Sequence, residues 1–136
     1  MHVSTLALAL AQLFVADGAA TALRRIDVST SSSPQYAVVT VFATVTATLR
    51  PRFVTIDSLG LALYAAGADS AVRRVTLVSG KTELLFGQAA VVGAADGVGA
   101  AATFSSTLAH LALDERNALY VADRGNAVRA VVCCIL

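Results

Sequence analysis

Three arginines recur at one position of a repeated motif and have the clearest potential for binding chemistry. They lie in TALRRI, SAVRRV and NAVRAV, and are Arg24, Arg73 and Arg129. A shared row of guanidinium groups would bind phosphate or another anion on one face. The competing interpretation pairs each arginine with a nearby aspartate, such as Asp17, Asp69 or Asp123. The formal net charge of +1 favours this pairing, because the chain then has no strong positive field.

The residues available for catalysis are few. His2 and His110 are the only histidines, and the Gly-x-Ser-x-Gly elbow of hydrolases is missing. No set of His, Asp and Glu has metal-ligand spacing. His110 lies in the apolar stretch TLAHLALD, which indicates an ordinary strand position. We therefore expect no catalytic residue, no metal site and no cofactor, and the binding residues stay unassigned.

The glycine-rich stretch GAADGVGAAATF, residues 93–104, invites comparison with phosphate-binding loops. It lacks the third glycine of a dinucleotide fingerprint and the Gly-Lys-Ser/Thr of a P-loop. The oxygen-ligand spacing of a calcium loop is also missing. We expect a structural connection in which glycines allow tight turning and close backbone approach.

The two ends of the sequence resemble processing signals. The start, MHVSTLALALAQLFVADGAA, resembles a signal peptide, although no Lys or Arg precedes its apolar run. The end, CCIL, fits a prenylation signal at Cys133, but no polybasic stretch precedes it, and a strand explains it more simply. The cysteines Cys133 and Cys134 are adjacent and have neither metal nor redox spacing, so they leave the compartment open.

The composition requires elements that are buried on both faces. Of the 136 residues, 57% are hydrophobic, against about 45 to 50% in typical globular chains, and only 14% are charged. No apolar run reaches the roughly 18 to 20 residues of a membrane-spanning helix. The near-zero net charge does not support a nucleic-acid partner.

The elements that carry these residues form a repeat. The apolar segments LFVAD, LYAAG and LYVAD begin at Leu13, Leu63 and Leu119, at intervals of 50 and 56 residues. This period is nearer to a propeller blade of about 40 to 50 residues than to a helical pair of about 34. Richness in Val, Thr and aromatic residues favours strands, and 40–49 alternates by twos, which places Val41, Ala43, Val45, Ala47 and Leu49 on one face.

The pattern predicts four strands in each of the first two units and three in the last. The expected strands are 6–11, 13–16, 21–28, 37–49, 53–56, 61–65, 71–78, 83–86, 108–113, 118–122 and 127–132. Pro34 and the serines of 29–33 mark a turn. Asp123, Arg124, Gly125 and Asn126 mark another, where Gly125 is free to take a positive φ and Asp123 or Asn126 to bond back to the backbone.

The stretch DGVGAAATF followed by LALDERNALYVADRGNAVRAV resembles the NHL-repeat family. Residues 96–131 match its motif closely, and the matching positions are Asp96, Gly97, Gly99, Phe104, Asp114, Tyr120, Asp123, Asn126 and Arg129. The second unit matches at Asp57, Tyr64 and Arg73, and the first at 14–17 and Arg24. The departures are Gly67 in place of an aspartate, Arg116 in place of a turn glycine, Ala127 in place of the namesake histidine and Thr107 near a usual proline.

The resemblance implies an all-β partial β-propeller of about three four-stranded antiparallel blades, the last incomplete. Its units span about 1–50, 51–103 and 104–136 of a single domain. Because a closed ring needs four to eight blades, we expect a fragment of a longer propeller; copies joined into a ring and an open arc are the alternatives. The expected function is a non-catalytic interaction module for a protein or other macromolecular partner. The enzyme alternative is a piece of a propeller hydrolase or lyase.

Overall fold

The computed structural model describes residues 3–9, 12–27, 38–44, 49–106, 108–125 and 127–131. The expected turn at 29–35 and the terminal CCIL lie outside these ranges, as do His2, Thr107 and Asn126. The described residues form an all-β structure with one short 3-10 turn, η1 (Gly99–Ala101), and no α-helix. None of them forms a helix long and apolar enough to cross a membrane.

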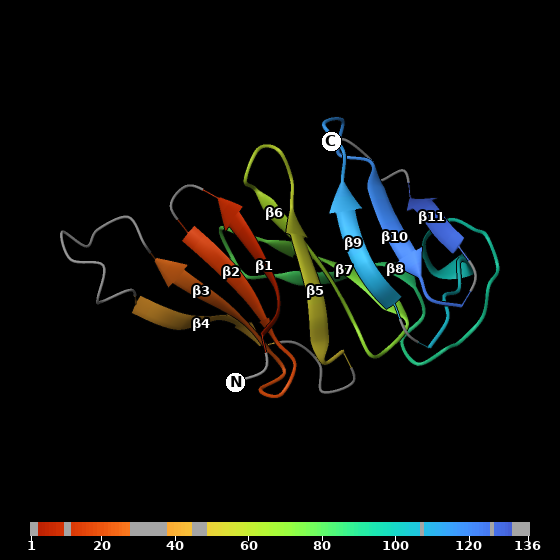
Figure 1. Ribbon diagram of the computed structural model, residues 1–136, viewed down its shortest axis with the longest axis horizontal. Coiled ribbons are helices and arrows are strands. Elements are labelled where there is room, and N and C mark those ends of the chain that lie inside the picture. Colours follow the sequence, from red (N-terminus) through yellow and green to blue (C-terminus); the bar gives the residue numbers. More distant parts are fainter. Residues whose placement is uncertain are drawn as a thin grey trace.

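The strands form three antiparallel sheets, which follow one another along the chain (Figure 1). The first sheet contains, in order, β1 (Val3–Ala9), β2 (Gln12–Asp17), β3 (Ala22–Asp27) and β4 (Val38–Thr44). The second contains β5 (Pro51–Ile56), β6 (Ala62–Gly67), β7 (Ala71–Thr76) and β8 (Thr82–Gly87). The third contains β9 (Leu108–Leu113), β10 (Leu119–Asp123) and β11 (Ala127–Val131). The all-β prediction is confirmed, and each expected strand has a counterpart.

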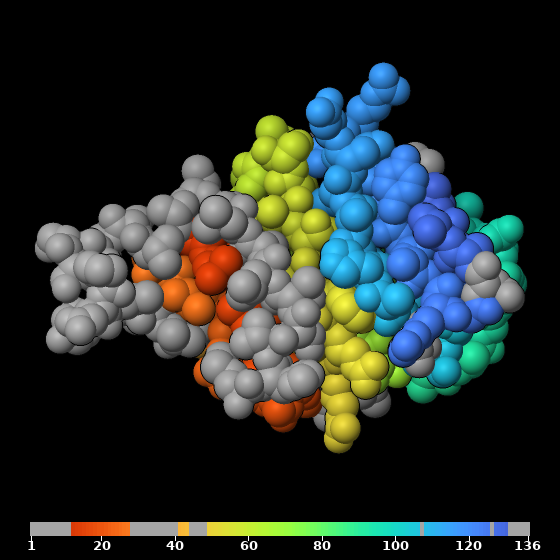
Figure 2. All heavy atoms as spheres, in the orientation of Figure 1, coloured from red at the N-terminus to blue at the C-terminus, as the bar shows by residue number. Residues whose placement is uncertain are grey.

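The first strand of each sheet, here called its leading strand, is β1, β5 or β9. Leading strands of successive sheets are neighbours in space. β1 contacts β5, and β5 contacts β9, so the sheets meet along these strands. Figure 1 shows the later strands diverging from this line, with β4 and β11 at opposite ends of the molecule. In Figure 2 the surfaces of β5 (yellow) and β9 (light blue) lie side by side, with β10 and β11 beyond them.

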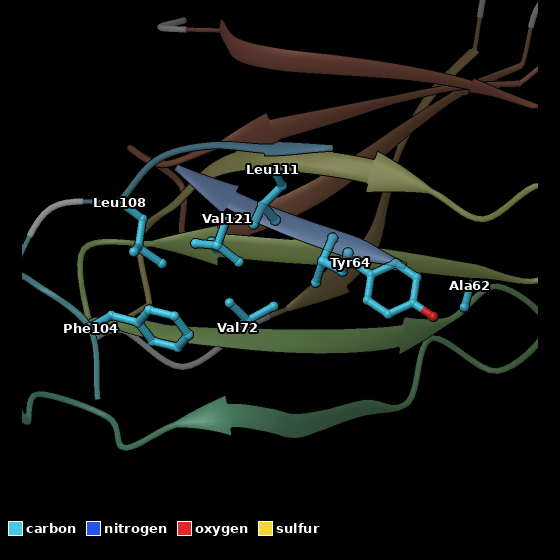
Figure 3. Packing of buried hydrophobic residues seen from close by; sticks show 9 residues of the cluster. Ala62, Tyr64, Val72, Phe104, Leu108, Leu111 and Val121 are labelled. Carbon is cyan, nitrogen blue, oxygen red and sulfur yellow. The ribbon is translucent and has the colours of Figure 1, made fainter. Parts of the chain in front are cut away.

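The core consists of two clusters, one between each pair of successive sheets. Between the first and second sheets lie Phe14, Ala16, Leu23, Ala43, Val54, Leu63, Ala65 and Val75. Between the second and third lie Ala62, Tyr64, Ala66, Val72, Phe104, Leu108, Leu111, Leu119 and Val121 (Figure 3). The second sheet is thus covered on both faces, which accounts for the high hydrophobic content.

One irregularity recurs in all three sheets. A residue of the leading strand is left unpaired opposite the end of the second strand, near Asp17, Gly67 and Asp123. The last strands of the first two sheets carry a second bulge, with Phe42 unpaired in β4 and Leu85 unpaired in β8. Because a bulge bends its strand locally, the shared bulge bends the first strand of each sheet at an equivalent position.

The alternation predicted for 40–49 is wrong in part. β4 ends at Thr44, and residues 45–48 lie outside the described ranges. The bulge at Phe42 interrupts the two-residue period, so Val41 is exposed while Ala43 is buried. Leu49 is fully buried but lies in a turn.

One turn prediction also needs correction. Gly125 does not take a positive φ. A side chain there would press on the Cβ of Ser105, so the glycine allows close approach, while Asp123 accepts a hydrogen bond from the Gly125 N–H as expected. In the turn after β9, where Arg116 replaces the family's glycine, Asn117 takes a positive φ. Asparagine tolerates this conformation better than most residues.

Candidate functional site

The repeat arginines occupy one register in the three sheets. Arg24 pairs with Val15 across its sheet, Arg73 pairs with Ala65, and Arg129 pairs with Val121. Each partner lies two residues before the end of its strand. The repeated motif therefore places the three guanidinium groups at equivalent points of three successive sheets.

In the first sheet, Arg24 pairs with Asp17. Its Nε donates to Asp17 Oδ2 over 2.7 Å, and the carboxylate is almost completely buried. Asp17 also accepts the backbone N–H of Ala20, which stabilises the tight turn into β3. The hydrogen bond from Arg24, assisted by that from Ala20, holds the pKa of Asp17 below its ordinary value.

In the second sheet, the aspartate that pairs with the arginine lies at a different position in the sequence. Gly67 lies where the first and third sheets have an aspartate, and a Cβ there would overlap the carbonyl oxygen of Leu49. Asp69, two residues later, instead pairs with Arg73 at 2.6 Å, and both side chains are more than nine-tenths buried. The packing against Leu49 thus explains the departure from the repeat pattern.

In the third sheet, Arg129 is held by several acceptors. Its Nη1 donates to the carbonyl oxygen of Thr103, and its Nη2 to that of Ala95, both over 2.7 Å. Nη2 also pairs with Asp96, and Nη1 lies 3.9 Å from Asp123. The sequence interpretation identified Asp123 but missed Asp96, which is 33 residues away in the chain. The stacking of Arg129 over the Phe104 ring, at 5.2 Å, completes its surroundings.

These contacts confirm the expected pairing of each arginine with an aspartate. A guanidinium that already has a buried carboxylate partner loses that partner's stabilisation when it turns toward an external anion. The three arginines therefore connect strands and loops, and they do not form a row of free cations.

The glycine-rich segment is a structural connection, as expected, between β8 and β9. A side chain on Gly97 would come within 2.8 Å of the Ala101 backbone, and Gly99 has a φ of +57°. Thr103 closes the loop by accepting the Ala95 N–H. Arg129 then binds the carbonyl oxygens of the same loop, so the segment is fixed to β11.

A hollow of about 710 Å³ lies between this segment, β8 and β11. Its apolar lining includes Phe86 from β8, Phe104 and Val98 from the connection, and Val128 from β11. Arg129 and Asp96 lie at its wall and are paired with each other. The hollow therefore combines apolar side chains with charged ones, and its Arg129 and Asp96 are paired with each other.

His110 lies in β9, a strand position as the sequence predicts, and its side chain is exposed. Its ring lies 5.7 Å from that of Phe53. Within the described ranges, no group of three or more His, Cys, Asp and Glu side chains is arranged to hold a metal ion. Asp114 serves a turn, because it accepts the N–H groups of Arg116 and Ala118.

No family model matches the sequence, and no curated protein matches it. Among solved structures, a structural genomics protein of unknown function from Bacteroides thetaiotaomicron VPI-5482 is similar, with a TM-score of 0.70 and 21% identity. The match covers 87% of this chain and 29% of the other, so this chain spans less than a third of that protein. The likeness concerns the fold alone.

Proposed function

We propose that this chain is a segment of an NHL-like β-propeller and acts as a non-catalytic interaction module for a protein partner. The arrangement of three successive sheets around neighbouring leading strands supports the propeller interpretation. The much greater length of the similar solved structure supports the view that the chain corresponds to part of a larger assembly of sheets.

The interaction role rests on which side chains the surface leaves available for contact. The repeat arginines are engaged in ion pairs, whereas the outer face of the third sheet exposes apolar side chains. Tyr120 is 38% exposed there, and Val128 is 72% exposed. Exposed aromatic and aliphatic groups on a rigid sheet favour contact with another protein.

Proximity labelling in cells tests this proposal, with the chain compared against a Tyr120→Lys variant. We expect a reproducible set of labelled proteins that the variant loses, because a lysine opposes burial of this face. The matched control is Leu59→Lys, since Leu59 is 70% exposed and lies in the turn between β5 and β6. A labelled set that is identical for all three proteins would contradict the proposal.

Calorimetry with Ca²⁺ and Zn²⁺, followed by an assay on ester and lactone substrates, tests the enzyme alternative. Propeller hydrolases of this kind would need a metal-binding group of acids or histidines. We expect neither metal binding nor turnover. Metal-dependent turnover that saturates with substrate would replace the interaction role with an enzymatic one.

A further inference from the structure

Two aspartates of this chain are followed directly by glycine, at Asp17-Gly18 and Asp96-Gly97. In such a dipeptide the glycine nitrogen can attack the aspartate side-chain carbon, because the glycine has no Cβ to hinder the approach. The attack forms a five-membered succinimide and releases water. Water then opens the ring at either carbonyl, which restores aspartate or leaves isoaspartate, whose main chain runs through Cβ and Cγ.

The fold holds the first dipeptide away from this reaction. Asp17 ends β2 and is paired with the strands on both sides, β1 and β3. Its buried carboxylate accepts the Ala20 N–H at Oδ1 and the Arg24 Nε at Oδ2. The hydrogen bond from Arg24 lowers the pKa of Asp17, which keeps the carboxyl in the ionised form, from which water is lost less readily. Rotation toward the Gly18 nitrogen would break both side-chain hydrogen bonds.

The second dipeptide lies in the glycine-rich connection between β8 and β9, outside any strand. Figure 1 shows this connection as an open loop beside β11. The Asp96 side chain is 96% exposed and pairs with Arg129, and among the described residues no acceptor bonds the Gly97 N–H. An exposed ion pair contributes little stability, so rotation of Asp96 toward the Gly97 nitrogen costs little.

The residues around this second dipeptide are anchored, so the loop would register the change. The Ala95 carbonyl oxygen accepts the Thr103 N–H and the Arg129 Nη2, and the Ala95 N–H donates to Thr103 Oγ1. After Gly97 the chain enters the 3-10 turn η1. An isoaspartate at position 96 would insert an extra main-chain carbon between these points and would place the carboxylate on Cα. The modification therefore alters the contact between the loop and β11.

We propose that Asp96-Gly97 is a site of spontaneous isoaspartate formation in the folded chain, whereas Asp17-Gly18 is protected. The Gly97 nitrogen bonds to Cγ of Asp96, and a water molecule leaves. Water then adds to the α-carbonyl carbon of Asp96, and the bond from that carbon to the nitrogen breaks. The sequence of steps involves no oxidation or reduction. Its product carries a free α-carboxylate, which is the group that isoaspartyl methyltransferases esterify.

Ageing of the full chain at neutral pH and body temperature, folded and in guanidinium chloride, tests the proposal. Trypsin separates the two dipeptides into peptides 1–24 and 82–116, in which electron-transfer fragmentation distinguishes isoaspartate from aspartate. In the folded chain we expect isoaspartate to form at least about tenfold faster at Asp96 than at Asp17, because the loop reacts without opening a core hairpin. In the unfolded chain the two rates should converge.

Asp96→Glu is the matched variant. It keeps a carboxylate for Arg129, but ring closure would then need a six-membered ring, which forms far more slowly. We expect methylation of the aged, folded chain by an isoaspartyl methyltransferase, with labelled S-adenosylmethionine as the methyl donor, to be lost in this variant. Asp17 serves as the internal control in every sample.

Three outcomes would overturn the proposal. The first is a rate at Asp96 that is no higher than at Asp17 in the folded chain, whether both sites react or neither does. The second is a difference between the sites that persists in the unfolded chain, because the local sequence and not the fold would then account for it. The third is methylation that Asp96→Glu retains.

Discussion

Each repeat arginine pairs with an acid, but the acids do not all come from equivalent positions. Asp17 and Asp123 end their strands, whereas Asp69 lies two residues beyond the strand end, and Asp96, a second partner of Arg129, belongs to the preceding connection. The arginine position is thus preserved while its partner varies. This is the pattern expected when the guanidinium organises local structure and does not hold a ligand.

Asp17 should make the stability of the first sheet depend on pH. Its pKa is lowered by the hydrogen bond from Arg24, so the folded chain binds this proton less tightly than the unfolded chain. The contribution is present above the ordinary value of 3.8 and is lost as the pH falls through the lower folded value. Asp17→Asn should cost about 1 to 3 kcal/mol at pH 7 and little at pH 2.

Urea unfolding at pH 7 and at low pH measures this difference. The control is Glu83→Gln, because the exposed Lys81–Glu83 pair also lowers the pKa of Glu83 but lies in solvent. We expect no measurable shift of the unfolding midpoint for that variant. An equal loss for Asp17→Asn at both pH values would mean that packing, and not the charge, is responsible.

Gly67 should not accept any side chain. A Cβ at this position would overlap the Leu49 carbonyl oxygen, and the Arg50 backbone is also within contact distance. Gly67→Ala should therefore destabilise the chain by about 1 to 3 kcal/mol, because the backbone of the connection to β5 must move. Thermal unfolding measures the loss. The neighbouring exposed Ala68→Ser should leave the midpoint unchanged, and a neutral Gly67→Ala would refute the steric explanation.

At the scale of elements, equivalent strands of different sheets differ in whether another sheet packs on them. Tyr64 of β6 is 5% exposed because the third sheet packs on it, whereas Tyr120, at the same place in β10, is 38% exposed. Tyr64→Ala should thus cost about 3 to 5 kcal/mol, and Tyr120→Ala much less. Urea unfolding of both variants provides the comparison. Similar losses would show that Tyr120 is covered in solution, as in a complex with another copy.

At the scale of the whole molecule, the main contacts between described strands of different sheets join sheets that follow one another along the chain. The cluster around Phe14 joins the first two sheets, and the cluster around Leu111 joins the last two. In such linear arrays, stability is approximately a sum of units and interfaces. A substitution that destabilises one interface between sheets should therefore have little effect on the other.

Native-state hydrogen exchange tests this locality. Phe14→Ala should accelerate exchange in β2 and β3 more than in β9 and β10, while Leu111→Ala should do the reverse. The two variants serve as controls for each other, since each removes a fully buried side chain. Uniform acceleration throughout the described strands, in both variants, would instead indicate a single cooperative unit.

Local sequence patterns are sufficient to predict the strands, most of their limits to within one residue, and the pairing of arginines with aspartates. Two-residue alternation, glycines and polar turn residues act over a few positions, so their effect can be read along the chain. The strand 108–113 is predicted with its observed limits, and Arg24–Asp17 joins adjacent strands of one hairpin. The predicted alternation in 40–49 is wrong in part, because a bulge at Phe42 interrupts the period between Val41 and Ala43.

The packing of whole sheets, by contrast, decides which equivalent residues are buried and which partners meet across long separations. Val72 and Val128 occupy the same motif position, yet the first is covered by a fourth strand and by the next sheet. Asp96 reaches Arg129 because the glycine-rich connection folds back over β11. Burial and long-range pairing depend on where the sheets lie, and a repeated local pattern carries no information about its neighbours in space.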